Sequence, residues 1–424
     1  MEEKFLTKNG IEIYGYKNPN LHGFFISLYL RAGSMYESES ESGITHFFEH
    51  IAIRNVNKQM GGALYSELDR RGVEFNASTQ SEMVQFYVSG AQDKFDFGAK
   101  ALTRILSPII LTPAEIDAER RRIKAEIREA DDKSSLAYFT YGIVHKGTSL
   151  ARFITGTLSG VSKISAKRLE EYRKNIFAKE NIFFYVTGNF TDDDINYLSK
   201  CIEEYDIPHA CAVRENIAPI SKYHFRRELE VYVKNAPFTS VRFTFDLDMS
   251  KLSVPVTDLI YDMLLSGYNS KLFIEMSEVR GLFYDITGGI ERYRNIGEFY
   301  FAYELRGKDI SEAIALTVDI LNGFKKNLVN SSEMMKSGYV DNADMLYDDT
   351  REFNFTMAYD NHIMKLGYGA LEERKATYAS VTPEEVRAAA CQIFTPENLT
   401  LTVKGNKKKI NTEEIKKFIL RLKN

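Results

Sequence analysis

The chain has 424 residues, of which 44% are hydrophobic and 27% are charged, as in an ordinary soluble globular protein. This length predicts two or three domains, because a single core stops growing well below it. The formal net charge of −4 provides no basic field for nucleic acid and no polybasic surface for a membrane, so we expect neither partner.

The cysteines and the start of the chain predict a cytoplasmic protein. The three cysteines are an odd number without C-x-x-C spacing, which is typical of reduced residues and not of a disulfide framework or a thiolate zinc site: Cys201, Cys211 and Cys391. The first residues are charged and lack the apolar region of a signal peptide. No apolar run is long enough to span a bilayer.

The first half alternates expected strands and helices. The run 23–30 is almost continuously apolar, as a buried strand would be. Thr112 and Glu115 form a capping box with Pro113 between them, which opens a charged helix. We predict strands at 11–14, 23–30, 83–89 and 181–188, and helices around His46 and at 62–71, 93–106, 112–130 and 166–175.

The second half repeats this order. We predict strands at 240–247 and 298–305, helices at 255–265 and 310–327, and further helical sequence over 331–366. The sequence I-F-x-x-E-N occurs at 176–181 and again at 393–398, each time between a helix and a strand that is followed by Gly-Asn. This repeat indicates an internal duplication at the scale of a domain.

His46, Glu49 and His50 carry the most specific chemistry. At spacings of three and four residues they share one face of an α-helix, for which Ser42 and Thr45 offer a start. Two imidazoles one turn apart can occupy two corners of a tetrahedral zinc site and leave the carboxylate free to act on water. The alternative is a pair of hydrogen-bonded helix histidines, although the chain has only seven histidines.

A third zinc ligand is expected from the charged helix. Glu119 and Glu126 are seven residues apart and therefore project from one helix face, which Ile116 and Ile123 largely share. The two isoleucines suggest that this face turns inward. A glutamate in such a helix is usually solvated, so the residues alone leave both glutamates as candidates.

The chain resembles the pitrilysin family of zinc peptidases, the inverzincins, which include insulin-degrading enzyme and the mitochondrial processing peptidase. The chain looks like a half-length bacterial member related to the mitochondrial processing peptidase, and the resemblance extends over nearly the whole chain. Six short segments match in order: Ala32-Gly33-Ser34; Gly43-x-x-His46-x-x-Glu49-His50; Gly72-x-x-x-Asn76-Ala77-x-Thr79; Glu119 with Glu126; His145 with Ile154-Thr155-Gly156-Thr157; and Ser270-Lys271-Leu272-Phe273 with Arg280-Gly281-Leu282-Phe283-Tyr284.

The resemblance implies an α+β fold of two homologous halves, each an antiparallel sheet packed with helices. We place a zinc-bearing catalytic half at residues 1–206, a linker at 207–223, and a second half without metal ligands at 224–424. In the family, two such chains or two pairs of halves close around a chamber that holds an extended peptide.

The resemblance also implies roles for the site residues. His46, His50 and Glu126 would bind one Zn²⁺ per chain, Glu49 would be the general base, and Glu119 would position the site without binding the metal.

Asn76 and Ala77 would lie on an edge strand that pairs with the substrate backbone. A turn asparagine before a core strand is the alternative.

The second half departs from the family pattern. Family enzymes carry an arginine seven residues before the tyrosine of R-G-L-x-Y, and the two residues contact substrate and the developing oxyanion. Counting back from Tyr284, that position holds Ser277, whereas Arg280 occupies the other arginine position. We therefore expect either a homodimer, in which Arg280 reaches the vacated place, or a heterodimer with a related subunit that supplies an Arg/Tyr pair.

We interpret the chain as a zinc-dependent endopeptidase that hydrolyses peptides or unfolded segments in a closed chamber, with peptide processing among the roles that the family includes. The alternative is a non-catalytic structural or adaptor subunit of a peptidase complex, which the intact zinc residues argue against. A purely structural zinc is disfavoured because the three ligands include no cysteine.

Overall fold

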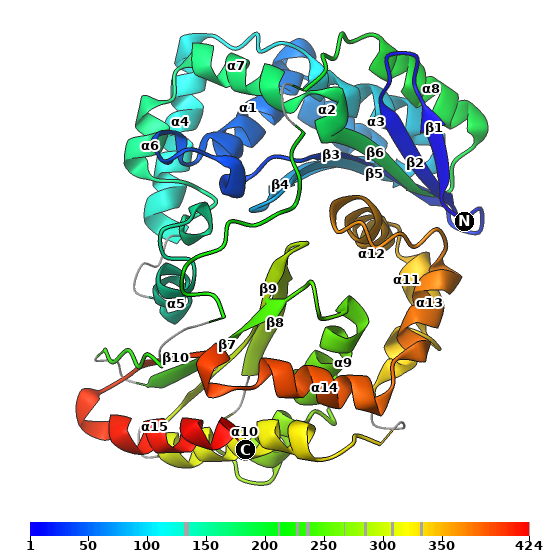
Figure 1. Cartoon of the computed structure of the whole chain (residues 1–424). Coiled ribbons are helices and arrows are strands. Elements are labelled where there is room, and N and C mark those ends of the chain that lie inside the picture. The colour runs from blue at the N-terminus through cyan, green and yellow to red at the C-terminus, as the bar shows by residue number, and fades with distance from the viewer. Residues whose placement is uncertain are drawn as a thin grey trace. The chain divides into compact units, whose positions relative to one another are not determined.

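The computed structural model describes residues 1–130, 135–210, 213–225, 229–234, 238–266, 268–283, 286–306, 309–330 and 334–423. The chain forms two compact units, each built on one sheet (Figure 1). The first unit comprises Met1–Asp131, Arg152–Asn216 and Ala343–Glu373. The second comprises Asp132–Ala151, Ile217–Asn342 and Arg374–Asn424.

These units are not the contiguous stretches 1–206 and 224–424 of the sequence duplication. Residues 135–151 pack with the second unit, although they come from the first half, and residues 343–373 pack with the first unit. Residues of the segment 343–373, such as Phe353 and Met357, are buried together with side chains of the first sheet, although the second half encodes them.

The first unit contains a six-stranded sheet. Its order is β1 (Glu3–Leu6), β2 (Glu12–Lys17), β6 (Ile182–Gly188), β3 (Gly23–Leu30), β5 (Val84–Ala91) and β4 (Glu74–Thr79). Neighbouring strands are antiparallel except β2 and β6, which are parallel. β4 is therefore an edge strand, and β3 lies in the interior of the sheet.

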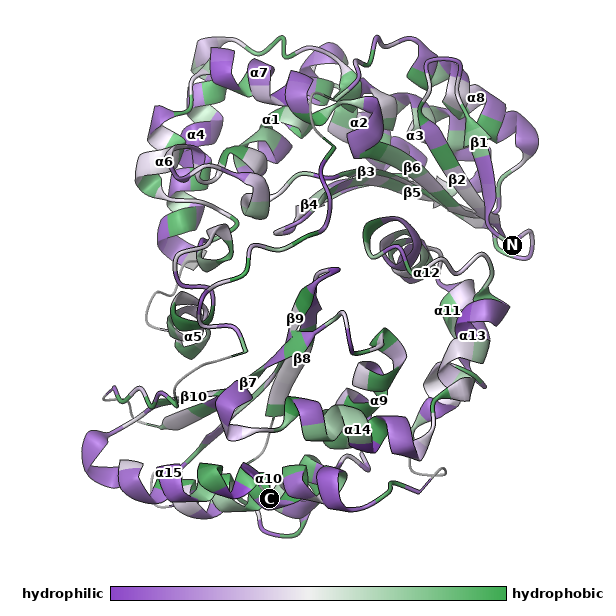
Figure 2. Cartoon of the chain, viewed as in Figure 1, coloured by the Kyte–Doolittle hydropathy of each residue, from purple (hydrophilic) through white to green (hydrophobic). Residues whose placement is uncertain are grey.

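Helices cover one face of this sheet. Alternate residues of β3, such as Phe24 and Leu28, point into the core that the sheet forms with them. Figure 2 shows that the covering helices, α8 among them, mix hydrophilic and hydrophobic residues, as amphipathic helices do. The helices on this side are α1 (Ile44–Gln59), α2 (Leu64–Arg71), α3 (Phe95–Thr103), α4 (Pro113–Ala130), α6 (Leu158–Lys163), α7 (Ala166–Ile176) and α8 (Asp192–Glu203).

The exchanged segment 343–373 covers the other face. It contains α11 (Ala343–Asp348) and α12 (Thr350–Ala358), followed by a π-helical turn at Tyr359–Ile363. Tyr29 of β3 is buried there and donates a hydrogen bond to Asn354 Oδ1 at 2.9 Å. β3 is thus buried on both faces, which explains its continuous apolar run. The helical stretch predicted over 331–366 is broken into these shorter pieces, and residues 331–333 lie outside the described part.

The second unit contains a four-stranded antiparallel sheet. Its order is β10 (Leu399–Lys404), β7 (Thr239–Asp248), β9 (Ile296–Leu305) and β8 (Ile286–Arg292). α5 (Leu136–Val144), from the other exchanged segment, contacts this sheet through a hydrogen bond between Thr140 and Thr402. The remaining helices of this part of the chain are α9 (Val254–Leu265), α10 (Ile310–Lys326), α13 (Leu371–Ser380), α14 (Pro383–Ile393) and α15 (Thr412–Leu420).

The predicted α+β fold of two related halves, each a sheet packed with helices, is confirmed. The prediction that both sheets are antiparallel is wrong for the first, because β2 and β6 are parallel. The repeated I-F-x-x-E-N sequence follows α7 in one half and α14 in the other, and each copy leads through a short 3-10 turn into a strand, β6 or β10. In both copies the asparagine, Asn181 or Asn398, closes that turn with its backbone N–H. None of the helices in the described residues has both the length and the apolarity that crossing a bilayer requires.

Candidate metal centre

The helix with the two histidines, α1, begins at Ile44, and a side chain from the segment before it caps its N-terminus. Its N-cap residue, Gly43, is left-handed (φ 94°), and neither Ser42 nor Thr45 provides the cap that the sequence suggested. Instead the Glu37 carboxylate accepts hydrogen bonds from the backbone N–H groups of Gly43 and Thr45, at 2.8 and 2.9 Å. Burial raises the pKa of this carboxyl, and the two N–H donors oppose that effect. Glu37 thus satisfies the donors that a helix start leaves unpaired.

Two glycines of the matched segments, Gly43 and Gly156, meet at the N-terminus of α1. A Cβ on Gly43 would lie 2.7 Å from the carbonyl oxygen of Thr155, and a Cβ on Gly156 would lie 2.3 Å from the Cα of Gly43. Both glycines have positive φ, 94° and 80°. The two backbones therefore approach more closely than any side chain permits, which explains why both segments carry glycine.

Replacing Glu37 with alanine is expected to destabilise the first unit by about 1–2 kcal/mol, the usual cost of losing a helix cap. Urea denaturation of the purified chain measures this loss. Glu39→Ala is the matched control, because Glu39 is an exposed glutamate in the same segment, and it should change stability by less than about 0.5 kcal/mol. Equal losses in the two variants would contradict the capping role.

His46, His50 and Glu126 converge on one point. His46 is buried, while His50 and Glu126 are partly exposed, and each offers a ligand atom within 4.8 Å of the others. The Nε2 atom of His46 lies 3.5 Å from Glu126 Oε1, and the Nε2 atom of His50 lies 3.7 Å from Glu126 Oε2. α1 supplies both imidazoles and α4 supplies the carboxylate.

This donor set fits zinc. Tetrahedral ligands at about 2.0–2.1 Å from Zn²⁺ lie roughly 3.3–3.4 Å from one another. Each histidine Nε2 lies within 3.7 Å of one oxygen of Glu126, and one ligand atom from each of the three residues lies within 4.8 Å of the others. Two imidazole nitrogens and one carboxylate are also the donors of many catalytic zinc sites, which keep the fourth position open. The described part of the chain holds no second group of this kind.

Glu119 lies behind His50. Its buried carboxylate, 2% exposed, accepts a hydrogen bond from His50 Nδ1 at 3.0 Å and another from Arg54 at 2.6 Å. Burial alone raises the pKa of this carboxyl, but the bond from His50 and the charge of Arg54 outweigh burial, and the pKa lies below its ordinary value. An ionised Glu119 holds the proton of His50 on Nδ1, so Nε2 keeps a lone pair for a metal.

Glu119 and Glu126, seven residues apart, lie on one face of α4, as predicted. Glu119 is buried, whereas Glu126 is partly exposed. Ile116 and Ile123, which share much of that face, are fully buried. Sequence reasoning did not identify Arg54, the cation beside Glu119. Its position four residues after His50 on α1 is the signal that could have found it.

Glu49 lies between the two histidines on α1 and is partly exposed. One of its carboxylate oxygens, Oε2, accepts a hydrogen bond from the hydroxyl of Thr79, the last residue of β4. Thr79 belongs to the matched segment Asn76-Ala77-x-Thr79, but its contact with Glu49 was not expected.

Asn76 and Ala77 lie in the middle of β4, opposite Tyr87 and Phe86 of β5. β4 ends the strand order, so its other edge faces away from β5. Asn76 is exposed and Ala77 is partly exposed. The two residues are thus in an edge strand, and the turn that was the alternative does not form at this position.

The remaining predicted residues belong to the second unit. Arg280 forms an ion pair with Glu312 of α10 at 3.5 Å, and Ser277 lies in a π-helical segment, Phe273–Glu278. Tyr284 lies outside the described residues. His145 is also part of the second unit, where it is buried 3.0 Å from Glu298.

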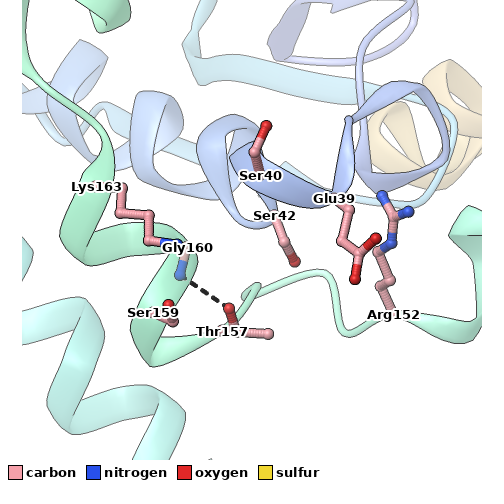
Figure 3. A pocket seen from close by; sticks show the side chains of 8 residues that line it. All are labelled: Glu39, Ser40, Ser42, Arg152, Thr157, Ser159, Gly160 and Lys163. Carbon is pink, nitrogen blue, oxygen red and sulfur yellow. Dashed lines mark hydrogen bonds between the residues drawn. The ribbon is translucent and has the colours of Figure 1, made fainter.

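A pocket of about 680 Å³ lies just before α1 in the first unit. Figure 3 shows Glu39, Ser40 and Ser42 on one side of it and Thr157, Gly160 and Lys163 on the other. Its lining includes none of the predicted site residues. The pocket is therefore distinct from the group formed by the histidines and Glu126.

Curated relatives match most or part of the chain. The zinc protease YmxG of Bacillus subtilis is 22% identical over 412 residues, which cover 94% of this chain and 97% of that protein. The mitochondrial-processing peptidase subunit beta of Rattus norvegicus is 26% identical over 210 residues, or 47% of this chain and 43% of the subunit.

Solved structures share the fold. The crystal structure of a protease from Helicobacter pylori superimposes with a TM-score of 0.81 and 16% identity, over 96% of this chain and 99% of that one.

Two family models match consecutive regions that together span most of the chain. Residues 16–156 match the insulinase model of peptidase family M16, and residues 163–336 match the peptidase M16 inactive domain. The first match contains the histidines and the glutamates of the metal centre, and the second contains Ser277 and Arg280. The chain therefore belongs to peptidase family M16, the insulinase family.

Proposed function

We propose that this protein is a zinc-dependent endopeptidase that hydrolyses peptides or unfolded segments. The observation that carries the proposal is the convergence of His46, His50 and Glu126 within 4.8 Å, with Glu49 between the histidines. A structural zinc site needs four protein ligands, whereas three ligands beside an acidic residue are typical of hydrolytic zinc sites.

Each residue of the site has its own role in the proposed reaction. A zinc ion held by His46, His50 and Glu126 would supply Lewis acidity, which polarises the scissile carbonyl and acidifies water. Glu49 accepts the water proton as general base and passes it to the leaving amine. Glu119 holds the His50 ring through Nδ1, at 3.0 Å, so that Nε2 keeps facing Glu126.

The edge strand β4 is evidence for an extended peptide as the substrate. Its outer edge offers backbone N–H and C=O groups with which a peptide strand can pair, as in β-augmentation. Thr79, at the end of this strand, reaches Glu49, so a peptide on the edge lies next to the proposed base. We propose that Asn76 and Ala77 contribute to this pairing, in which the backbone gives affinity and the side chains add selectivity.

A related partner subunit is the second part of the proposal. Ser277 stands where family enzymes carry an arginine, and it has no charge with which to bind an oxyanion. Arg280, the nearby arginine, is paired with Glu312. One relative of the chain is itself a subunit of the mitochondrial processing peptidase. We infer that a related chain with an Arg/Tyr pair completes the substrate site, because losing one oxyanion donor costs on the order of 10²–10³ in kcat.

An adaptor role is the rival function. The match of residues 163–336 to a domain described as inactive, together with Ser277, favours it. The intact residues of the metal centre favour a peptidase, since an adaptor has no use for them.

Cleavage of a peptide library by the purified chain tests these alternatives. We expect slow, zinc-dependent cleavage by the chain alone, and a rate on the order of 10² higher after mixing with a related subunit that has the Arg/Tyr pair. Light scattering reports whether the two chains associate. A zinc-loaded chain that cleaves nothing in either state would favour the adaptor, and a fully active homodimer would refute the mixed pair.

A further inference from the structure

Thr79 joins two elements of the candidate site. It is the last residue of β4 and lies opposite Val84 of β5, and its hydroxyl donates a hydrogen bond to Oε2 of Glu49 on α1. The edge strand and the metal-binding helix are thus connected through one side-chain contact at the proposed general base.

Backbone hydrogen bonds hold the turn that follows Thr79, and one of them comes from a residue outside β4 and β5. The turn after β4 closes with a hydrogen bond from Gln80 N–H to the carbonyl of Met83, and the carbonyl of Ser81 accepts one from Met35 N–H, each at 2.8 Å. A Cβ on Gly33 would lie only 2.3 Å from that Ser81 oxygen, so glycine is needed where the two segments meet. The turn that follows Thr79 is therefore held by contacts with other residues of the fold.

A glutamate needs such support. Its side chain has three torsion angles, and a general base must be held close to its working geometry. The hydroxyl of Thr79 occupies one carboxylate oxygen of Glu49 and leaves the other, Oε1, to receive a proton. Hydrogen bonds to a carboxylate are among the stronger ones in proteins, so this single contact can select one rotamer.

We infer that Thr79 is a positioning residue, which aligns Glu49 for proton transfer and couples it to the peptide-binding edge of β4. This inference rests on the proposed function and extends it to a residue outside the metal centre. Because Thr79 ends the strand on which the peptide would lie, the substrate backbone and the base share one rigid frame.

Thr79→Val tests the inference, because valine keeps the branched shape that suits a strand and removes only the donor. We expect kcat for peptide hydrolysis to fall about tenfold or more, with KM and zinc content unchanged. Thr79→Ser restores the hydroxyl and should recover most of the rate. Thr103→Val is the matched control, since the Thr103 hydroxyl of α3 bonds backbone carbonyls of its own helix; its kcat should equal that of the wild type.

A double-mutant cycle identifies the partner. If Thr79 acts through Glu49, Thr79→Val should cause no further loss in a Glu49→Gln background. Loss of zinc in Thr79→Val, an equal loss of rate in both backgrounds, or a failure of Thr79→Ser to recover rate would overturn the inference.

The cycle also separates this inference from the proposed function. Full activity in Glu49→Gln would refute the proposed peptidase mechanism itself. An inactive Glu49→Gln together with a wild-type kcat in Thr79→Val would refute only the role of Thr79.

Discussion

Replacing Glu49 with glutamine is expected to slow peptide hydrolysis at least about 100-fold while zinc stays bound. The expected loss follows from the general base, whose removal typically costs 10²–10⁴ in rate. Zinc should remain because the converging donors are His46, His50 and Glu126, and Glu49 is not among them. Glutamine has nearly the same shape as glutamate and still accepts the hydrogen bond from Thr79, so the fold around it should persist.

Steady-state kinetics and metal analysis of the same preparation check this prediction. Glu39→Gln, at an exposed glutamate in the segment before α1, controls for the loss of one negative charge in the same unit and should leave the rate unchanged. Retention of more than a few per cent of the wild-type rate in Glu49→Gln, or a loss of its zinc, would contradict the assignment of the base.

Removing any one of the three ligands is expected to empty the site. His46→Ala, His50→Ala and Glu126→Gln each leave two protein donors, too few to hold zinc against dialysis. Glu119→Gln should keep substantial zinc, because Glu119 contacts His50 at Nδ1 and not at the nitrogen that faces Glu126. Its turnover should fall, since changing a residue that orients a ligand typically costs 10- to 100-fold in affinity or activity.

Zinc content of the four purified variants, measured by mass spectrometry, decides the ligand set. Glu129→Gln is the matched control, because Glu129 is an exposed glutamate one turn beyond Glu126 on α4. A zinc-free Glu119→Gln beside a zinc-loaded Glu126→Gln would contradict this ligand set and would exchange the roles of the two glutamates.

The parts of the site that follow from helix periodicity could be predicted from the sequence. His46 and His50 share one face of α1, and Glu119 and Glu126 share one face of α4, because spacings of four and seven residues fix the direction of a side chain on a helix. The capping box of Thr112 and Glu115 set the start of α4 in the same local way, and it forms as predicted.

Contacts between distant segments could not be predicted in this way. Glu37 caps α1 from seven residues before its first helical residue, and Thr79 reaches Glu49 from another element thirty positions away. Arg54 is close in sequence to His50, yet its partner Glu119 comes from a second helix. Each of these side chains is polar and would read as solvated without the tertiary structure that brings its partner near.

The exchange of segments between the two units could not be predicted from the sequence either. A continuous apolar run in β3 predicts a strand buried on both faces, but it does not say which part of the chain covers the second face. The cover is the segment 343–373, more than three hundred residues later, where Asn354 bonds Tyr29. A break of the predicted helical stretch 331–366 into short helices lets this segment follow the sheet.

We propose that His46, His50 and Glu126 hold one catalytic zinc ion. The most direct test removes metal from the purified chain with a chelator and titrates zinc back while peptide hydrolysis is followed. We predict that hydrolysis disappears with the metal and returns in proportion to added zinc, reaching its maximum at one zinc ion per chain. Hydrolysis that survives complete removal of zinc, or that fails to return in a chain refilled with one zinc ion, would contradict a catalytic zinc ion at this site.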